Sequence, residues 1–163
     1  DKSIENGVQL AESSNLQIQI DSPKDLSIKT LDVVRDLSFS VCDRVKYVAV
    51  KCWQSPVEKS VLTELNQIAD DLRLTIHMLE HFNGLVDYTH VDTAAVNGLR
   101  VMLERFANDL DKAAKTSDYK ACSSLLVNRL ESNMRELVVE CDNLQVRILS
   151  NSVEDPSREA SLV

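Results

Sequence analysis

Apolar residues recur in steps of three and four along four long segments of this chain, and this spacing constrains its fold more than any other feature. Such steps place side chains on one face of an α-helix, which has about 3.6 residues per turn. Four amphipathic helices joined by short links predict an all-α, up-down antiparallel four-helix bundle, which buries all four faces together. The stripes comprise Leu31, Val34, Leu37, Val41, Val45, Val48 and Cys52; Val61, Leu65, Ile68, Leu72, Thr75, Leu79, Phe82 and Val86; Val96, Leu99, Leu103, Phe106, Leu110 and Ala113; and Tyr119, Cys122, Leu126, Leu130, Met134, Leu137, Cys141, Leu144 and Ile148.

Turn-forming residues are scarce, with three Gly and three Pro in 163 residues. Few turns over this length predict long elements, which favours helices. Aromatic residues make up only 4% of the chain, so the core is expected to be aliphatic. The valine-rich stretch 44–53 at the end of the first stripe also fits a β-strand, and both interpretations stay open there.

Capping patterns mark where the helices are expected to begin. Ser22 is followed by Pro23 and Asp25, which suits an N-cap and the first helical turn. The segment 55–58, Ser-Pro-Val-Glu, is typical of a capping box with proline at the first position. Asp92 and the segment 115–118 predict two further starts. Asn83-Gly84 predicts the end of the second helix, although that helix could also continue to about Tyr88.

Both ends of the chain differ from the helical segments. Residues 1–21 are predicted to form an N-terminal extension, in which Leu16, Ile18 and Ile20 alternate as in a strand and could pair with 7–10 in a short β-hairpin. An unordered leader is the alternative. The bundle domain is expected to span 22–150, and 151–163 to be a flexible tail. The final Ser161-Leu162-Val163 fits a C-terminal peptide that adds a strand to a PDZ groove, which would make the tail a ligand.

The charge and cysteine content exclude several classes. A net charge of −8 repels phosphate backbones and anionic lipid, so neither nucleic acid nor a membrane is an expected partner. No apolar run approaches the roughly 18 residues of a membrane span. The four cysteines form no Cys-x-x-Cys motif, and three of them fall on apolar stripes. They are predicted to be buried free thiols in a reducing compartment, which favours a cytoplasmic location.

The segment 77–81, His-Met-Leu-Glu-His, matches the inverted zinc-peptidase motif His-x-x-Glu-His. Leu79 lies on the buried stripe, and His77 and His81 each lie two residues from it. They therefore project roughly 160° away from the core, toward solvent. No Glu-x-x-His pair suggests a di-iron site. We expect no catalytic residues and no cofactor, with His77 and His81 as the remaining metal-site candidates.

The last two helical segments carry apolar residues outside their stripes. Because these side chains need a cover, they predict either a wide core or a face that binds a partner: Val101, Met102, Val127, Val138, Val139 and Val146. The predicted contact residues are Val101, Met102, Val127, Val138 and Val146. The second segment, 61–86, could also form a coiled coil with another chain. The expected function is a non-enzymatic interaction module (an adaptor, chaperone or assembly subunit) that binds another protein or a second copy of itself. The alternative is a metal-binding sensor or hydrolase that uses His77, Glu80 and His81.

Overall fold

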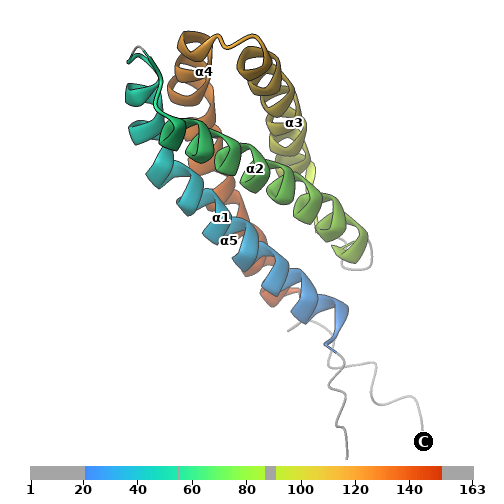
Figure 1. The fold of residues 1–163 in the computed structure, drawn as a ribbon. Coiled ribbons are helices and arrows are strands. Elements are labelled where there is room, and N and C mark those ends of the chain that lie inside the picture. Colours follow the sequence, from blue (N-terminus) through green and yellow to red (C-terminus); the bar gives the residue numbers. More distant parts are fainter. Residues whose placement is uncertain (1–20, 55, 87–90, 152–163) are drawn as a thin grey trace, which may run out of the picture.

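A computed structural model of the chain describes residues 21–54, 56–86 and 91–151 (Figure 1), and no strand occurs among them. The first three helices are α1 (Pro23–Lys51), α2 (Lys59–Val86) and α3 (Ala94–Lys115). The fourth is continuous through α4 (Tyr119–Leu125), the π-helical turn η1 (Leu126–Leu130) and α5 (Glu131–Ser150). The all-α class with four helices is confirmed, including the valine-rich end of α1. The hairpin predicted within 1–21 and the tail from 152 onward lie outside the described residues.

Two of the predicted helix starts are confirmed. Ser22 Oγ accepts the backbone N–H of Asp25 at 3.1 Å, and the Asp25 carboxylate accepts the backbone N–H of Ser22, so the capping box is complete. Pro23 occupies the first position of α1. At α4, the Asp118 carboxylate accepts the N–H of Ala121 at 3.0 Å. Each cap satisfies donors that the first helical turn leaves without a partner.

The predicted start of α2 is wrong. This helix begins at Lys59, three residues after Pro56, so proline does not occupy its first position. The carbonyl of Glu58 accepts the N–H groups of Val61 and Leu62, so Glu58 is the residue that immediately precedes the first turn of α2. Val57 packs against the core. Ser55, the predicted cap, lies outside the described residues.

Of the two predicted ends of α2, Asn83-Gly84 is not the observed one, because the helix continues to Val86, which is buried. The later predicted end, Tyr88, lies outside the described residues. Burial of Val86 offsets the cost of about 1 kcal/mol of a helical glycine. The cap of α3 is Thr93, one residue after Asp92, although the Asp92 carboxylate does accept the N–H of Ala94 at 2.9 Å.

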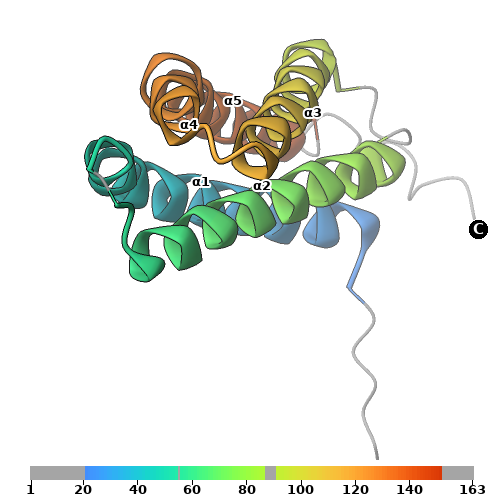
Figure 2. The same ribbon diagram turned by 45° about the horizontal axis from the view of Figure 1, so that its top comes forward.

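The four stripes meet in one hydrophobic core. Every stripe residue is buried except Leu37 and Tyr119, which are half-buried. The helices α1 and α2 lie in one layer, and α3, α4 and α5 lie over them (Figure 2). In the described part of the chain α1 packs against α2 and α5, and α3 packs against α2, α4 and α5. No Cα atom of α1 comes within 8 Å of one in α3. These helices also include no stretch both long and apolar enough to cross a membrane.

The turn η1 keeps the fourth helix facing the core. Its stripe advances by three successive steps of four, from Cys122 through Leu126 and Leu130 to Met134. Three α-helical turns hold about 10.8 residues, so these twelve residues contain about one too many. The π-helical turn absorbs the extra residue through the bond from the Glu131 N–H to the Leu126 carbonyl. Residues on both sides of η1 are therefore buried.

Candidate functional site

The motif at 77–81 lies on the outer face of α2. The His77 side chain is 78% exposed, and its Nδ1 lies 3.7 Å from Glu80 Oε2. His81 is also exposed. The predicted outward orientation of both rings is thus confirmed. The other oxygen of Glu80 lies 3.4 Å from an Arg100 nitrogen. Within the described ranges no three His, Cys, Asp or Glu side chains gather as a metal site would require, so the pair offers two ligands without surrounding walls.

Three of the five residues predicted to bind a partner share one flank of the fourth helix. Val127 and Val146 are 50% and 63% exposed, and Val138 is half-buried. Neighbouring residues contact α1, so all three valines lie beside that helix: Ser123 bonds to the Ala49 carbonyl, Glu131 pairs with Lys46, and Asp142 pairs with Arg35.

The other two predicted residues lie elsewhere. Met102 is exposed and Val101 is half-buried on α3. The Cα atoms of α3 do not approach those of α1. These two residues therefore do not join the valines beside α1, and the predicted partner-binding residues do not form a single surface.

Sequence reasoning missed the α1 half of this surface. Phe39 and Val50 are 52% and 67% exposed on α1, and Val139 and Leu149 are 56% and 50% exposed on α5. Phe39 lies one turn from Arg35 and from Cys42, both of which contact α5. A search for off-stripe apolar residues in 23–51 would have found Phe39 and Val50. We define the α1–α5 surface as Phe39, Val50, Val127, Val138, Val139, Val146 and Leu149.

A groove of about 290 Å³ lies at the middle of the α1–α5 surface. Its walls are largely apolar, with one charge of each sign at the edge: Phe39, Cys42, Asp43, Arg135, Val138 and Val139. Burial raises the pKa of the Cys42 thiol, so the sulfur is protonated near neutral pH. A protonated thiol is a poor nucleophile. This groove therefore suits binding of an apolar side chain better than covalent chemistry.

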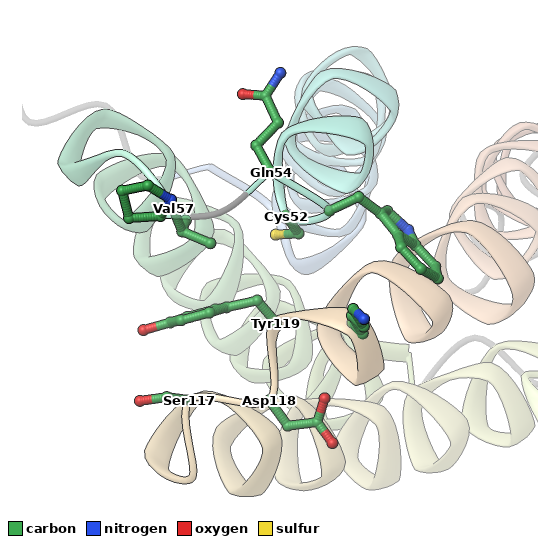
Figure 3. A pocket seen from close by; sticks show the side chains of 9 residues that line it. Cys52, Gln54, Val57, Ser117, Asp118 and Tyr119 are labelled. Carbon is green, nitrogen blue, oxygen red and sulfur yellow. The ribbon is translucent and has the colours of Figure 1, made fainter.

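A larger, open hollow of about 520 Å³ lies at one end of the helices (Figure 3). It lies between the end of α1, the α1–α2 loop and the α3–α4 turn. Trp53 lines it and is 61% exposed, yet its ring is fixed: Nε1 donates to Ser123 Oγ at 2.8 Å, and the Lys120 ammonium lies 5.6 Å from the ring centroid. The lining residues are Cys52, Trp53, Gln54, Pro56, Val57, Ser117, Asp118, Tyr119 and Lys120.

Two of the groups that line this hollow are a neutral thiol and a carboxylate that already accepts a hydrogen bond. Burial raises the pKa of Cys52, which keeps its thiol neutral. The Asp118 carboxylate already caps α4. Neither group is placed as a nucleophile beside a base, which acyl or proton transfer would require. Comparison of the chain with protein-family models, with curated proteins and with solved structures found no match.

Proposed function

We propose that the chain is a non-enzymatic interaction module, such as an adaptor, chaperone or assembly subunit, that binds a protein through the α1–α5 surface. One observation carries this proposal. The groove walled by Phe39, Val138 and Val139 lies between further exposed apolar side chains on the same two helices. Single exposed apolar residues are ordinary, whereas several that gather around a groove on two adjacent helices are typical of a binding surface.

The energetics of burial support a protein partner. Removing apolar area from water contributes about 25 cal/mol per Å², so covering about 400 Å² would contribute roughly 10 kcal/mol before entropic losses. Phe39 would enter a partner as an aromatic anchor, as large rigid side chains do at the centres of interfaces. The small groove volume favours side chains of a partner protein over a buried small ligand.

The proposal treats the four helices as an up-down antiparallel bundle that presents a rigid two-helix face. Support comes from the order of contacts, since each helix packs against the next along the chain and the fourth returns to α1. Polar contacts hold these neighbours in register. The buried Asp71 carboxylate of α2 accepts bonds from Arg44 of α1 at 2.9 Å and from Gln67 at 3.0 Å. Arg73 likewise binds Asp111 of α3 with two bonds.

Site-specific photo-crosslinking tests the proposal. A photoreactive amino acid would replace Val139 in one variant and Leu74 in a control, because Leu74 is similarly exposed, at 46%, but lies on α2. Expression in the source cells should give a protein adduct of discrete mass from position 139 only. A further Phe39→Glu change should abolish that adduct. Equal adducts from both positions, or none from 139, would contradict the proposal.

The alternative, a metal-binding sensor or hydrolase, uses the exposed His77, Glu80 and His81. The closeness of His77 Nδ1 to the Glu80 carboxylate is the observation that favours it. Titration with zinc separates the two functions. Stoichiometric zinc binding that is lost in His77→Ala would support the metal site, whereas the interaction module predicts no difference between the parent chain and that variant.

A further inference from the structure

We infer that the partner of the α1–α5 surface is a second copy of the same chain, related to the first by a two-fold axis. In this arrangement α1 lies antiparallel over α1 of the second copy, and α5 lies antiparallel over α5. The inference rests on the proposed function, and it commits that function to self-association. It is carried by the positions of charged and apolar residues about the middle of the surface, where Phe39 and Val139 would each meet their own counterpart.

The charges are self-complementary about this middle. Lys46 lies seven residues after Phe39, and Asp32 lies seven residues before it. The two-fold axis therefore places Lys46 over Asp32 of the second copy. On α5, Arg135 precedes Val139 by four residues, and Asp142 follows it by three. The axis thus places Arg135 over Asn143, within one residue, or about 1.5 Å along the helix, of Asp142.

The exposures of these side chains fit such contacts, although Asp32 is the least exposed of the four at 44% and its carboxylate also accepts bonds from Arg35 and Gln145. Lys46 and Arg135 are 70% and 64% exposed, whereas Glu131, which pairs with both, is only 17% exposed. Toward the other end of the surface, the Asp142 side chain is 56% exposed, whereas the side chain of its partner Arg35 is only 31% exposed. Of these four side chains, the two basic ones lie in one half of the surface and the two acidic ones in the other half, and Asp43 at the groove edge adds a carboxylate to the first half. Two copies can meet here even though the chain carries a net charge of −8.

The outer apolar residues match in the same way. Val127 lies twelve residues before Val139 and Leu149 lies ten residues after it, so across the axis their levels differ by two residues, or about 3 Å. Val50 and Ile28 lie eleven residues to either side of Phe39, or about 16 Å along the helix. Ile28 is half-buried. Apolar contacts would therefore recur at the middle and at both ends, with the ion pairs between them.

The surface is large enough for a stable dimer. The 29 residues of α1 extend about 43 Å, and two helices packed side by side present a face about 20 Å wide. A contact along the whole of this face would cover a projected area of about 800 Å² per copy, which is comparable to the area that each partner buries in a specific interface. Figure 1 shows α5 extending beside α1 over much of its length, which supplies this two-helix face.

A charge-exchange experiment tests the inference. The first variant carries Lys46→Glu and Arg135→Glu, which leaves both halves of the surface acidic. The second carries Asp32→Lys and Asp142→Lys, which leaves basic side chains at all four of these positions. Sedimentation equilibrium between about 1 µM and about 1 mM should show the parent chain as a dimer. Each variant alone should have a dimer Kd raised at least ten-fold, and an equimolar mixture should regain the parental Kd as a heterodimer.

Two single substitutions keep the inference testable if the charge variants fail to fold. Val139→Asp should weaken dimerisation as strongly, with unchanged helical circular dichroism, whereas Leu74→Asp on α2 should have no effect. A parent chain that stays monomeric throughout, or a mixture that associates no better than its components, would overturn the inference. If a monomeric chain still gives adducts with other proteins at position 139, the proposed function survives without self-association. If a monomeric chain gives no adduct at position 139, both the proposed function and the inferred self-association are wrong.

Discussion

At the scale of single residues, Ser123 connects the fourth helix to the end of α1. The last four carbonyls of a helix lack helical partners. In α1, the carbonyls of Val48, Val50 and Lys51 accept backbone N–H groups, and that of Ala49 accepts the Ser123 hydroxyl at 2.8 Å. The same hydroxyl accepts Trp53 Nε1. One buried oxygen thus satisfies a carbonyl and fixes an exposed ring.

Substitution of Ser123 tests this connection. Ser123→Ala should lower the free energy of unfolding by roughly 1–2 kcal/mol, because it leaves the buried Ala49 carbonyl without its partner. Since Trp53 is the only tryptophan in the chain, its fluorescence anisotropy should also fall as the ring gains freedom. Ser124→Ala, at the exposed neighbouring position, is the matched control. Equal effects of the two substitutions would refute the role of Ser123.

Ser117 ends α3 in a conformation that favours glycine. Its φ is 57°, its N–H binds the Ala114 carbonyl, and the Asp118 N–H binds that of Ala113. This is a Schellman motif with serine in the left-handed position. Ser117→Gly should therefore raise the free energy of unfolding by about 0.5–1 kcal/mol in urea denaturation. Ser117→Ala keeps the Cβ and should bring no gain. If the two substitutions have equal effects, the strain is absent.

The buried thiols couple stability to pH. Desolvation raises the pKa of Cys122 to about 11, with a further contribution from the neighbouring Cys52, and raises that of Cys141 to about 12. Unfolded thiols titrate near 8.5. The folded chain therefore retains these protons after the unfolded chain has lost them. The stabilisation is complete below about pH 8.5 and is lost as the pH rises toward the folded values.

We expect the free energy of unfolding to decrease between about pH 9 and pH 11 by roughly 1.4 kcal/mol per pH unit for each of these thiols. Denaturant unfolding at a series of pH values measures this slope. Cys141→Ala should reduce the slope of the free energy of unfolding against pH by the contribution of one thiol. This reduction is expected whatever the substitution does to stability at pH 7. An identical slope in the parent and the variant would show that Cys141 titrates normally in the folded chain.

At the scale of elements, the apolar spacing predicted all four helices because burial of a stripe dominates helix formation in proteins. It also contained a signal for η1 in the three successive steps of four that begin at Cys122. The start of α2 could not be predicted in this way. The capping pattern at 55–58 is a local preference of about 1 kcal/mol, and the packing of Val57 against the core opposes it.

The account of η1 predicts which deletions the fourth helix tolerates. Removing the exposed Asn128 changes the steps after Cys122 to four, three and four, which a regular α-helix accommodates. This variant should unfold cooperatively, within about 1–2 kcal/mol of the parent chain. Removing the exposed Glu136 instead leaves a step of two between Met134 and Leu137, which rotates the rest of α5 away from the core. Thermal unfolding followed by circular dichroism should separate the two, and equal stabilities would contradict the account.

At the scale of the whole molecule, the stripes predict which faces are buried but not which helices become neighbours. The five predicted partner-binding residues illustrate this limit. Their surplus apolar character was visible in the sequence, but the packing order decides that Val138 is on a helix that packs against α1 and that Met102 is on one that does not. Ion pairs between helices, such as Arg44 with Asp71, could not be predicted from the sequence for the same reason. Solvent exposure of His77 and His81 was predictable because their positions on one helix decide it.

The central claim is that the α1–α5 surface becomes covered in solution. Methyl NMR with a soluble paramagnetic agent measures this directly at low and high protein concentration. The methyl groups of Val127, Val139 and Val146 should be accessible in the dilute sample and protected in the concentrated one, while those of Leu74 should stay accessible in both. Equal accessibility of all four residues at every concentration, or protection of Leu74 alone, would contradict the claim.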